Sequence, residues 1–328
     1  MFTLLLASVA FGQHPTAGNI SSLAISNNCI ALCDYDGRVR IRMKRNTKGE
    51  KSIAVPGGVR YLQWTGDGSR LVLAGPKQIS MVTQDGLATG QTLSLLPWKE
   101  ISALDVACDG TLVAFGSNEG DLVVWNPATG KRRTHKLGND IQSVAFSADH
   151  RLLACGNRSQ LDIIDSSSFN TLASVDLNKG FNNYIYSISF ISGHEILCSL
   201  SDGTVRICDA TKVSRNRILI HGKGQCLSST AFDHGRKIAA ITIRGNNRTG
   251  LERDQVISCS VSGKQHQVMD LVQQPACLAA FPNDDFFYIA FRNGIIKKVQ
   301  ANRQGVIKLP ITASSDVLVR DLTYSVRL

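Results

Sequence analysis

Residues 101–125 run Ile101-Ser-Ala-Leu-Asp-Val106, Ala-Cys-Asp-Gly110, Thr111-Leu-Val-Ala-Phe-Gly116, Ser-Asn-Glu-Gly120 and Asp121-Leu-Val-Val-Trp125. Three short apolar runs alternate here with two turns that end in glycine. Asp-Gly pairs supply the positive backbone angles that tight hairpins require, and runs rich in Val, Leu and Phe favour strands. The segment therefore predicts three consecutive antiparallel strands.

The first of these strands recurs along the whole chain. A run that begins with an apolar residue and reaches another aliphatic or aromatic residue five positions later opens near residues 20, 59, 101, 141, 185, 227 and 276. Repeats of about forty residues, each made of several short strands, are typical of propeller blades. No stretch of twelve or more residues carries apolar positions at helical spacing.

These patterns predict an all-β fold, a seven-bladed β-propeller of four-stranded antiparallel blades. We expect a single domain over residues 1–328, because a ring of repeats grows by adding blades and not by thickening one core. The segments 1–19 and 313–328 are expected to close the ring, since pairing a terminus with a blade removes an exposed sheet edge.

The repeats resemble those of the WD-repeat family over about residues 20–312. The resemblance rests on Ile141-Gln-Ser-Val-Ala-Phe-Ser147 and on Asp202-Gly-Thr-Val-Arg-Ile-Cys-Asp209. The repeats are divergent, because only Trp125 occupies the family's Trp position and no Gly-His pair precedes a first strand. The polar His-Ser-Asp-Trp network of that family is thus mostly absent, and we expect apolar packing between blades to supply most of the stability.

Composition indicates a folded chain with a strong positive charge. Of 328 residues, 43% are hydrophobic, and 36 Lys and Arg against 26 Asp and Glu give a net charge of +10. This balance favours acidic partners, meaning acidic protein segments first, and nucleic acid or an anionic membrane as alternatives. The nine cysteines are odd in number and scattered without a Cys-x-x-Cys pair, which predicts reduced core residues and a cytoplasmic location, with the nucleus as the other option.

The sequence carries none of the common catalytic signatures. It has no Gly-x-Ser-x-Gly elbow, no His-Glu-x-x-His and no phosphate-binding loop. The histidines are dispersed among expected turns and loops, which favours solvated or structural roles over metal ligation; they are His14, His135, His150, His194, His221, His234 and His266. We therefore expect no enzymatic activity, no cofactor, no metal and no small-molecule substrate.

The resemblance indicates which surface binds partners. In WD-repeat propellers, the turn between the second and third strands and the start of the first strand share one face, which usually carries partner contacts. Carried over residue by residue, these positions give the candidate binding residues Tyr35, Arg60, Lys77, Asn118, Gln142, Arg158, Tyr186, Ser201 and Arg292, together with the smaller Ser21, Ser102, Ser228 and Cys277. Arg and aromatic residues dominate interface energetics, which favours binding over mere capping of the ring.

A second candidate surface is a basic strand. Strand alternation places one set of side chains on the face opposite Val39, Ile41 and Met43, and with the following arginine the predicted basic patch is Arg38, Arg40, Arg42, Lys44 and Arg45. Such a patch favours RNA or phosphoinositide, although no aromatic residues alternate with the cations as single-stranded nucleic acid binding prefers. A solvated strand face is the alternative interpretation.

The leading hypothesis is a non-catalytic scaffold that mediates protein–protein interactions in a cytosolic or nuclear multiprotein complex. In fewer features the chain also resembles the membrane-tethered propellers that act as guanine-nucleotide exchange factors for the small GTPase of COPII vesicle formation. Those features are a late-blade excursion at 244–255 and the closing segment Val317–Ser325. A Gly-rich loop is catalytic in that family, and its nearest match here is Ala10–Gly18. This resemblance implies exchange activity at the surface of the endoplasmic reticulum as the alternative.

Overall fold

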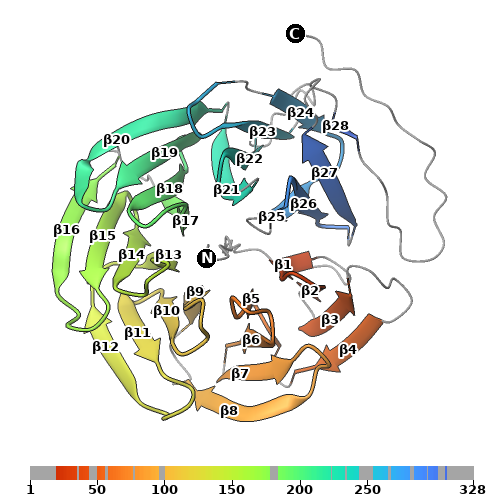
Figure 1. Cartoon of the computed structure of the whole chain (residues 1–328), viewed down its shortest axis with the longest axis vertical. Helices are drawn as coiled ribbons and strands as arrows, with labels where there is room; N and C mark the ends of the chain where they lie inside the picture. Colours follow the sequence, from red (N-terminus) through yellow and green to blue (C-terminus); the bar gives the residue numbers. More distant parts are fainter. Residues whose placement is uncertain are drawn as a thin grey trace.

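In the computed structural model, seven four-stranded antiparallel sheets stand like spokes around a common centre (Figure 1). The structure describes residues 20–34, 37–43, 50–55, 58–76, 78–95, 100–177, 184–222, 224–232, 235–243, 254–264, 267–280, 284–293, 295–301 and 307–308. No helix occurs in these ranges. The predicted all-β, seven-bladed fold is confirmed.

Each blade uses four consecutive strands. The first three blades are β1 (Ile20–Ile25), β2 (Cys29–Asp34), β3 (Arg38–Met43) and β4 (Glu50–Ala54); β5 (Tyr61–Trp64), β6 (Arg70–Ala74), β7 (Gln78–Thr83) and β8 (Ala88–Ser94); and β9 (Ile101–Val106), β10 (Val113–Ser117), β11 (Asp121–Trp125) and β12 (Arg132–Lys136). The fourth and fifth are β13 (Ile141–Phe146), β14 (Leu152–Asn157), β15 (Gln160–Asp165) and β16 (Thr171–Asp176); and β17 (Ile185–Phe190), β18 (Glu195–Leu200), β19 (Thr204–Asp209) and β20 (Lys212–His221). The last two are β21 (Gln225–Phe232), β22 (Lys237–Ile243), β23 (Asp254–Ser260) and β24 (Gln267–Leu271); and β25 (Pro275–Ala279), β26 (Phe286–Phe291), β27 (Ile296–Ala301) and β28 (Ile307–Lys308).

The first strand of every blade lies nearest the centre, and the fourth lies toward the rim (Figure 1). The opening segments expected from the sequence are identical to β1, β9, β13 and β17, and the other three innermost strands begin within two residues of the expected openings. The segments predicted to close the ring, 1–19 and 313–328, lie outside the described residues.

The ring closes where β1 packs beside β25. One apolar cluster there joins Ile20 and Leu23 of the first blade to Cys277 and Ala279 of the last, all at most 2% exposed. Apolar clusters also join each of the other neighbouring pairs of blades. Burial of apolar surface contributes about 25 cal/mol per Å², so these clusters are a continuous stabilising layer around the ring, as the sequence led us to expect.

Buried polar bonds between blades were not foreseen from the sequence. The Asp105 carboxylate on β9 accepts the Phe146 backbone N–H at 2.7 Å and the Gln63 side-chain amide at 2.9 Å, so it ties three consecutive blades together. Burial raises the pKa of Asp105 to about 7, although the N–H groups of Phe146 and Val106 act in the opposite direction. Asp105 therefore links three neighbouring blades, and its carboxyl group has a pKa near neutral pH.

Candidate interaction face

A β-bulge at the start of the innermost strand orients the side chains of the predicted face. The innermost strands β1, β9, β13 and β17 each pair with the second strand of their own blade. In each of these pairings one residue of the innermost strand has no partner; these residues are Ser21, Ser102, Gln142 and Tyr186. A bulged residue is left out of the ladder and its side chain is re-aimed. The predicted positions in these four blades are thus the bulged ones.

Three of the smaller predicted positions require correction. Ser102 is bulged but buried, at 7% exposed, and its hydroxyl donates to the Ile141 carbonyl. The other two lie one residue beyond the bulge. In β21 and β25 the skipped residues are Leu227 and Ala276, one position earlier than expected. Ser228 and Cys277 are consequently buried, at 0% and 2% exposed. The bulge lies one residue earlier in these two blades. The prediction, which took the residue after the opening apolar residue of each repeat, therefore selected a side chain that points into the interior.

The second turns and the starts of the innermost strands do lie together. In three blades a backbone N–H just before the second turn donates to a carbonyl oxygen just before the first strand: Asn118 to Glu100 at 3.2 Å, Ser201 to Tyr184 at 2.9 Å and Arg292 to Gln274 at 3.0 Å. These bonds hold the two classes of predicted position side by side. Tyr35 and Lys77 lie outside the described residues.

The densest group of predicted residues lies where the fourth and fifth blades meet. The Tyr184 ring stacks on the Tyr186 ring, with centroids 6.2 Å apart and planes at 13°. The Tyr184 N–H donates to Ser201 Oγ at 2.9 Å, and the Ile185 N–H donates to the Arg158 carbonyl at 2.7 Å. Burial, and then the neighbouring Tyr184, raise the pKa of Tyr186, so its hydroxyl remains a hydrogen-bond donor at neutral pH.

Asp140 completes this group from the fourth blade. Its Oδ2 accepts a hydrogen bond from the Gln142 amide, whereas its Oδ1 is buried and has no hydrogen-bond partner among the described residues. Burial raises the pKa of Asp140, against the opposing effects of Gln142 and the Arg158 charge. A buried acceptor without a partner costs about 1–3 kcal/mol. Because this oxygen is closed to solvent, its cost belongs to the fold and not to the contact surface.

A second group joins the second and third blades. Arg60 Nη2 lies 3.3 Å from Glu100 Oε1, and the two side chains are 50% and 56% exposed. An exposed pair of this kind contributes about 0–1 kcal/mol, so it does not lock the surface. Arg60 and Asn118, two predicted residues, are thus both linked to Glu100.

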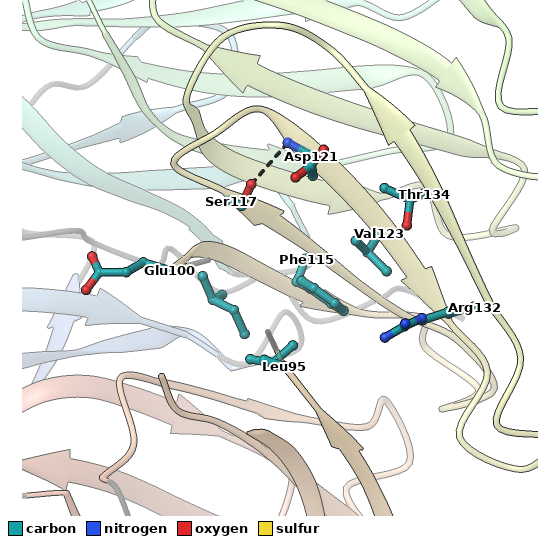
Figure 2. A pocket seen from close by; sticks show the side chains of 9 residues that line it. Leu95, Glu100, Phe115, Ser117, Asp121, Val123, Arg132 and Thr134 are labelled. Atoms are coloured by element: carbon teal, nitrogen blue, oxygen red, sulfur yellow. Dashed lines mark hydrogen bonds between the residues drawn. The ribbon is translucent and has the colours of Figure 1, made fainter. Parts of the chain in front are cut away.

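Glu100 also stands at the edge of a cavity of about 120 Å³ against the flank of the third blade (Figure 2). Its apolar wall is formed by Leu95, Ile101, Phe115 and Val123, and its polar margin by Glu100, Ser117, Asp121, Arg132 and Thr134. The cavity is smaller than the pockets that enclose drug-sized ligands. Its size and apolar wall suit one side chain of a partner.

Sequence reasoning missed Glu100, Asp140 and Tyr184, which are central to both groups. Each of them immediately precedes the apolar residue that opens its repeat. The family pattern selects the position after that residue, so these three residues were passed over. A scan of both flanking positions would have found them.

The basic strand is only partly open to solvent. As alternation predicted, Val39 and Ile41 are buried, and the arginines alternate with them along β3. Arg38 is exposed, but Arg40 and Arg42 are half-buried. Lys44 and Arg45 lie outside the described residues, so the patch as a whole stays a prediction.

The cysteines match the expectation from the sequence in part. All nine cysteines are free and eight are buried, as expected, whereas Cys108 is only half-buried. In the described ranges, no three side chains of the metal-binding types come together as a metal site. Across the same ranges, no helix is long and apolar enough to cross a bilayer.

The features behind the exchange-factor alternative lie outside the part of the chain that the structure describes. They are the loop Ala10–Gly18, the closing segment Val317–Ser325 and most of the excursion at 244–255. That alternative therefore stays a hypothesis.

No protein-family model matches this chain, and no curated protein is significantly similar to it.

Proposed function

We propose that this propeller is a non-catalytic scaffold that binds other proteins through the face formed by its second to fifth blades. The observation that carries the proposal is the stacked pair Tyr184 and Tyr186 beside the exposed Arg158. Tyrosine and arginine are the residue types most frequent among interface hot spots.

The expected partner has an acidic or mixed polar segment. Arg158 is exposed, and its charge also acts on Asp140 of the same group. The net charge of +10 favours approach of an acidic surface before contact is made. We place this scaffold in a cytosolic or nuclear assembly.

Site-specific photo-cross-linking tests the proposal. A photoreactive amino acid at position 186 is expected to trap one or a few polypeptides from native extract. The matched control carries it in place of Leu172, which is 58% exposed on β16 at the rim of the fourth blade. The trapped polypeptides should bind wild-type protein after purification and lose affinity for an Arg158→Glu variant. Equal trapping at 186 and 172, or unchanged affinity, would contradict the proposal.

The same purified protein separates the scaffold from the exchange-factor alternative. Small GTPases loaded with fluorescent nucleotide should release it no faster when the propeller is added. Accelerated release from any of them would show that the protein acts on a catalytic cycle and is more than a scaffold.

A further inference from the structure

Three reactive side chains meet at the end of the blades opposite the interaction face. The Cys108 Sγ lies 2.9 Å from Nε2 of His150, and Nδ1 of the same ring lies 3.4 Å from Oδ2 of Asp109. Cys108 and Asp109 belong to the first turn of the third blade, and His150 to the first turn of the fourth. The two turns are one repeat apart in the sequence.

The hydrogen-bond pattern indicates which ring nitrogen of His150 carries the proton. The Cys108 thiol has two acceptors within reach, Nε2 of His150 and, at 3.6 Å, the Ala148 carbonyl. The Cys108 backbone N–H donates to Nε2 of His150 at 3.0 Å, so the Nε2 lone pair faces Cys108. The ring proton then sits on Nδ1, where it faces the Asp109 carboxylate. An acceptor nitrogen beside a thiol, oriented from behind by a carboxylate, is the arrangement that activates cysteine nucleophiles.

The backbone of His150 has a conformation that glycine adopts more easily, so the turn itself does not favour a histidine at this position. Its φ is +60°, while the corresponding residues of the second and third blades are Gly68 and Gly110, with φ of 69° and 70°. These three residues occupy equivalent positions, because the backbone N–H of each donates a hydrogen bond to the carbonyl oxygen three residues earlier. A left-handed conformation costs a residue with a side chain about 1–2 kcal/mol, and strain of this kind marks functional positions.

The imidazole is also held in place by its surroundings. The Phe146 ring meets it edge-on, with centroids 6.3 Å apart, and the Ser166 hydroxyl donates to the His150 carbonyl. The side chain is 18% exposed, so the ring is sheltered without being sealed. A fixed ring keeps Nε2 aimed at the sulfur.

The other cysteines provide an internal contrast. All eight are buried, and burial raises the pKa of Cys33, Cys226 and Cys277 to about 12 and that of Cys259 to about 11. Since the thiolate is the nucleophile, buried thiols of this kind are inert. Cys108 differs from them in both exposure and neighbours.

We propose that Cys108 is a redox-reactive thiol, with His150 as its base and Asp109 as the residue that positions His150, and that its co-reactant is a hydroperoxide. Nε2 takes the S–H proton, and the thiolate attacks one peroxide oxygen. The S–O bond forms while the O–O bond breaks. The sulfur loses two electrons and becomes a sulfenic acid, and the leaving group takes the proton from the imidazolium: hydroxide from hydrogen peroxide gives water, and alkoxide from an organic hydroperoxide gives an alcohol. A hydroperoxide is small and requires only access to the sulfur.

Chemical labelling of the folded protein tests the assignment. After brief exposure to hydrogen peroxide, a sulfenic-acid trap read by mass spectrometry should label Cys108 ahead of every other cysteine. Iodoacetamide should also alkylate Cys108 first. Labelling of a second cysteine at the same rate would overturn the proposal.

The role of the base is tested by His150→Gly, which restores the residue that the turn favours and so protects the fold. Alkylation at neutral pH should fall at least about tenfold, and the rate–pH profile should move toward that of a free thiol. His150→Asn, whose side chain tolerates a positive φ, should behave in the same way. His194→Ala, in the first turn of the fifth blade, should alkylate like wild type. Wild-type rates in both His150 variants would overturn the role of His150.

Discussion

The third, fourth and fifth blades carry their second turns at the interaction face and their first turns at the opposite end, and the two ends differ in their chemistry. At the interaction face, the Tyr184 and Tyr186 stack is half-open and Asp140 Oδ1 has no described partner. At the opposite end, Cys108 and His150 satisfy one another. Between the ends, buried bonds such as those of Asp105 hold the blades together. The comparison indicates that the middle of the blades holds the ring together, whereas the two ends carry different chemical groups.

The largest effect should come from the middle of the blades. Asp105→Ala leaves the Phe146 N–H and the Gln63 amide without their acceptor in the interior. Each buried donor left without its acceptor costs about 1–3 kcal/mol, so we expect a total loss of about 2–6 kcal/mol. Urea unfolding should show this loss of free energy, and a loss below 1 kcal/mol would mean that the ring does not depend on this link.

The pH dependence of stability sharpens the same point. The folded pKa of Asp105, about 7, is above its ordinary value of 3.8, so the folded state holds this proton more tightly than the unfolded chain. The contribution is full below about pH 4 and is lost as the pH rises through 7, with an upper limit of about 4 kcal/mol. Urea unfolding of wild type and Asp105→Asn at several pH values should show this decline in wild type only. Parallel curves would contradict it.

The next effect concerns binding and not folding. Replacing Tyr184 and Tyr186 together by Ala removes the aromatic stack of the interaction face. We expect partner affinity to fall by about 30-fold or more, the size of a hot-spot loss, with little change in thermal unfolding. Leu172→Ala on the rim is the control and should change neither quantity. If the double variant unfolds early while the partner still binds, the stack is structural.

A smaller loss is expected at a second interblade bond. Ser143 Oγ accepts the Ile188 N–H at 2.8 Å between the fourth and fifth blades. Ser143→Ala should lower the free energy of unfolding by about 1–3 kcal/mol, because that buried donor loses its partner. Urea unfolding measures it, and no loss would place water or another acceptor at this bond.

The smallest effect is expected at the exposed pair of the interaction face. Arg60→Ala should change the free energy of unfolding by less than about 1 kcal/mol, because the Arg60–Glu100 pair is half-exposed. Thermal unfolding at low and high salt checks this. A loss of several kcal/mol would mean that Arg60 is needed for the stability of the ring.

The sequence allowed the blades to be predicted because their signals are local. Alternating apolar runs and Asp-Gly turns lie within about forty residues, and four innermost strands were placed to the residue. The bulges shifted the contact positions by one in two blades, and a repeat rule cannot see such a shift. The group of Cys108 and His150 was missed because it joins different positions of successive turns. A histidine at a place where neighbouring repeats carry glycine was the available signal.

Hydrogen exchange of the propeller with and without the partner trapped at position 186 tests the central claim most directly. We predict slower exchange at residues 140–142, 158–160 and 184–186, and unchanged exchange on β16 and in the first turns at 107–111 and 147–151. Slower exchange confined to those first turns or to the rim would contradict the account.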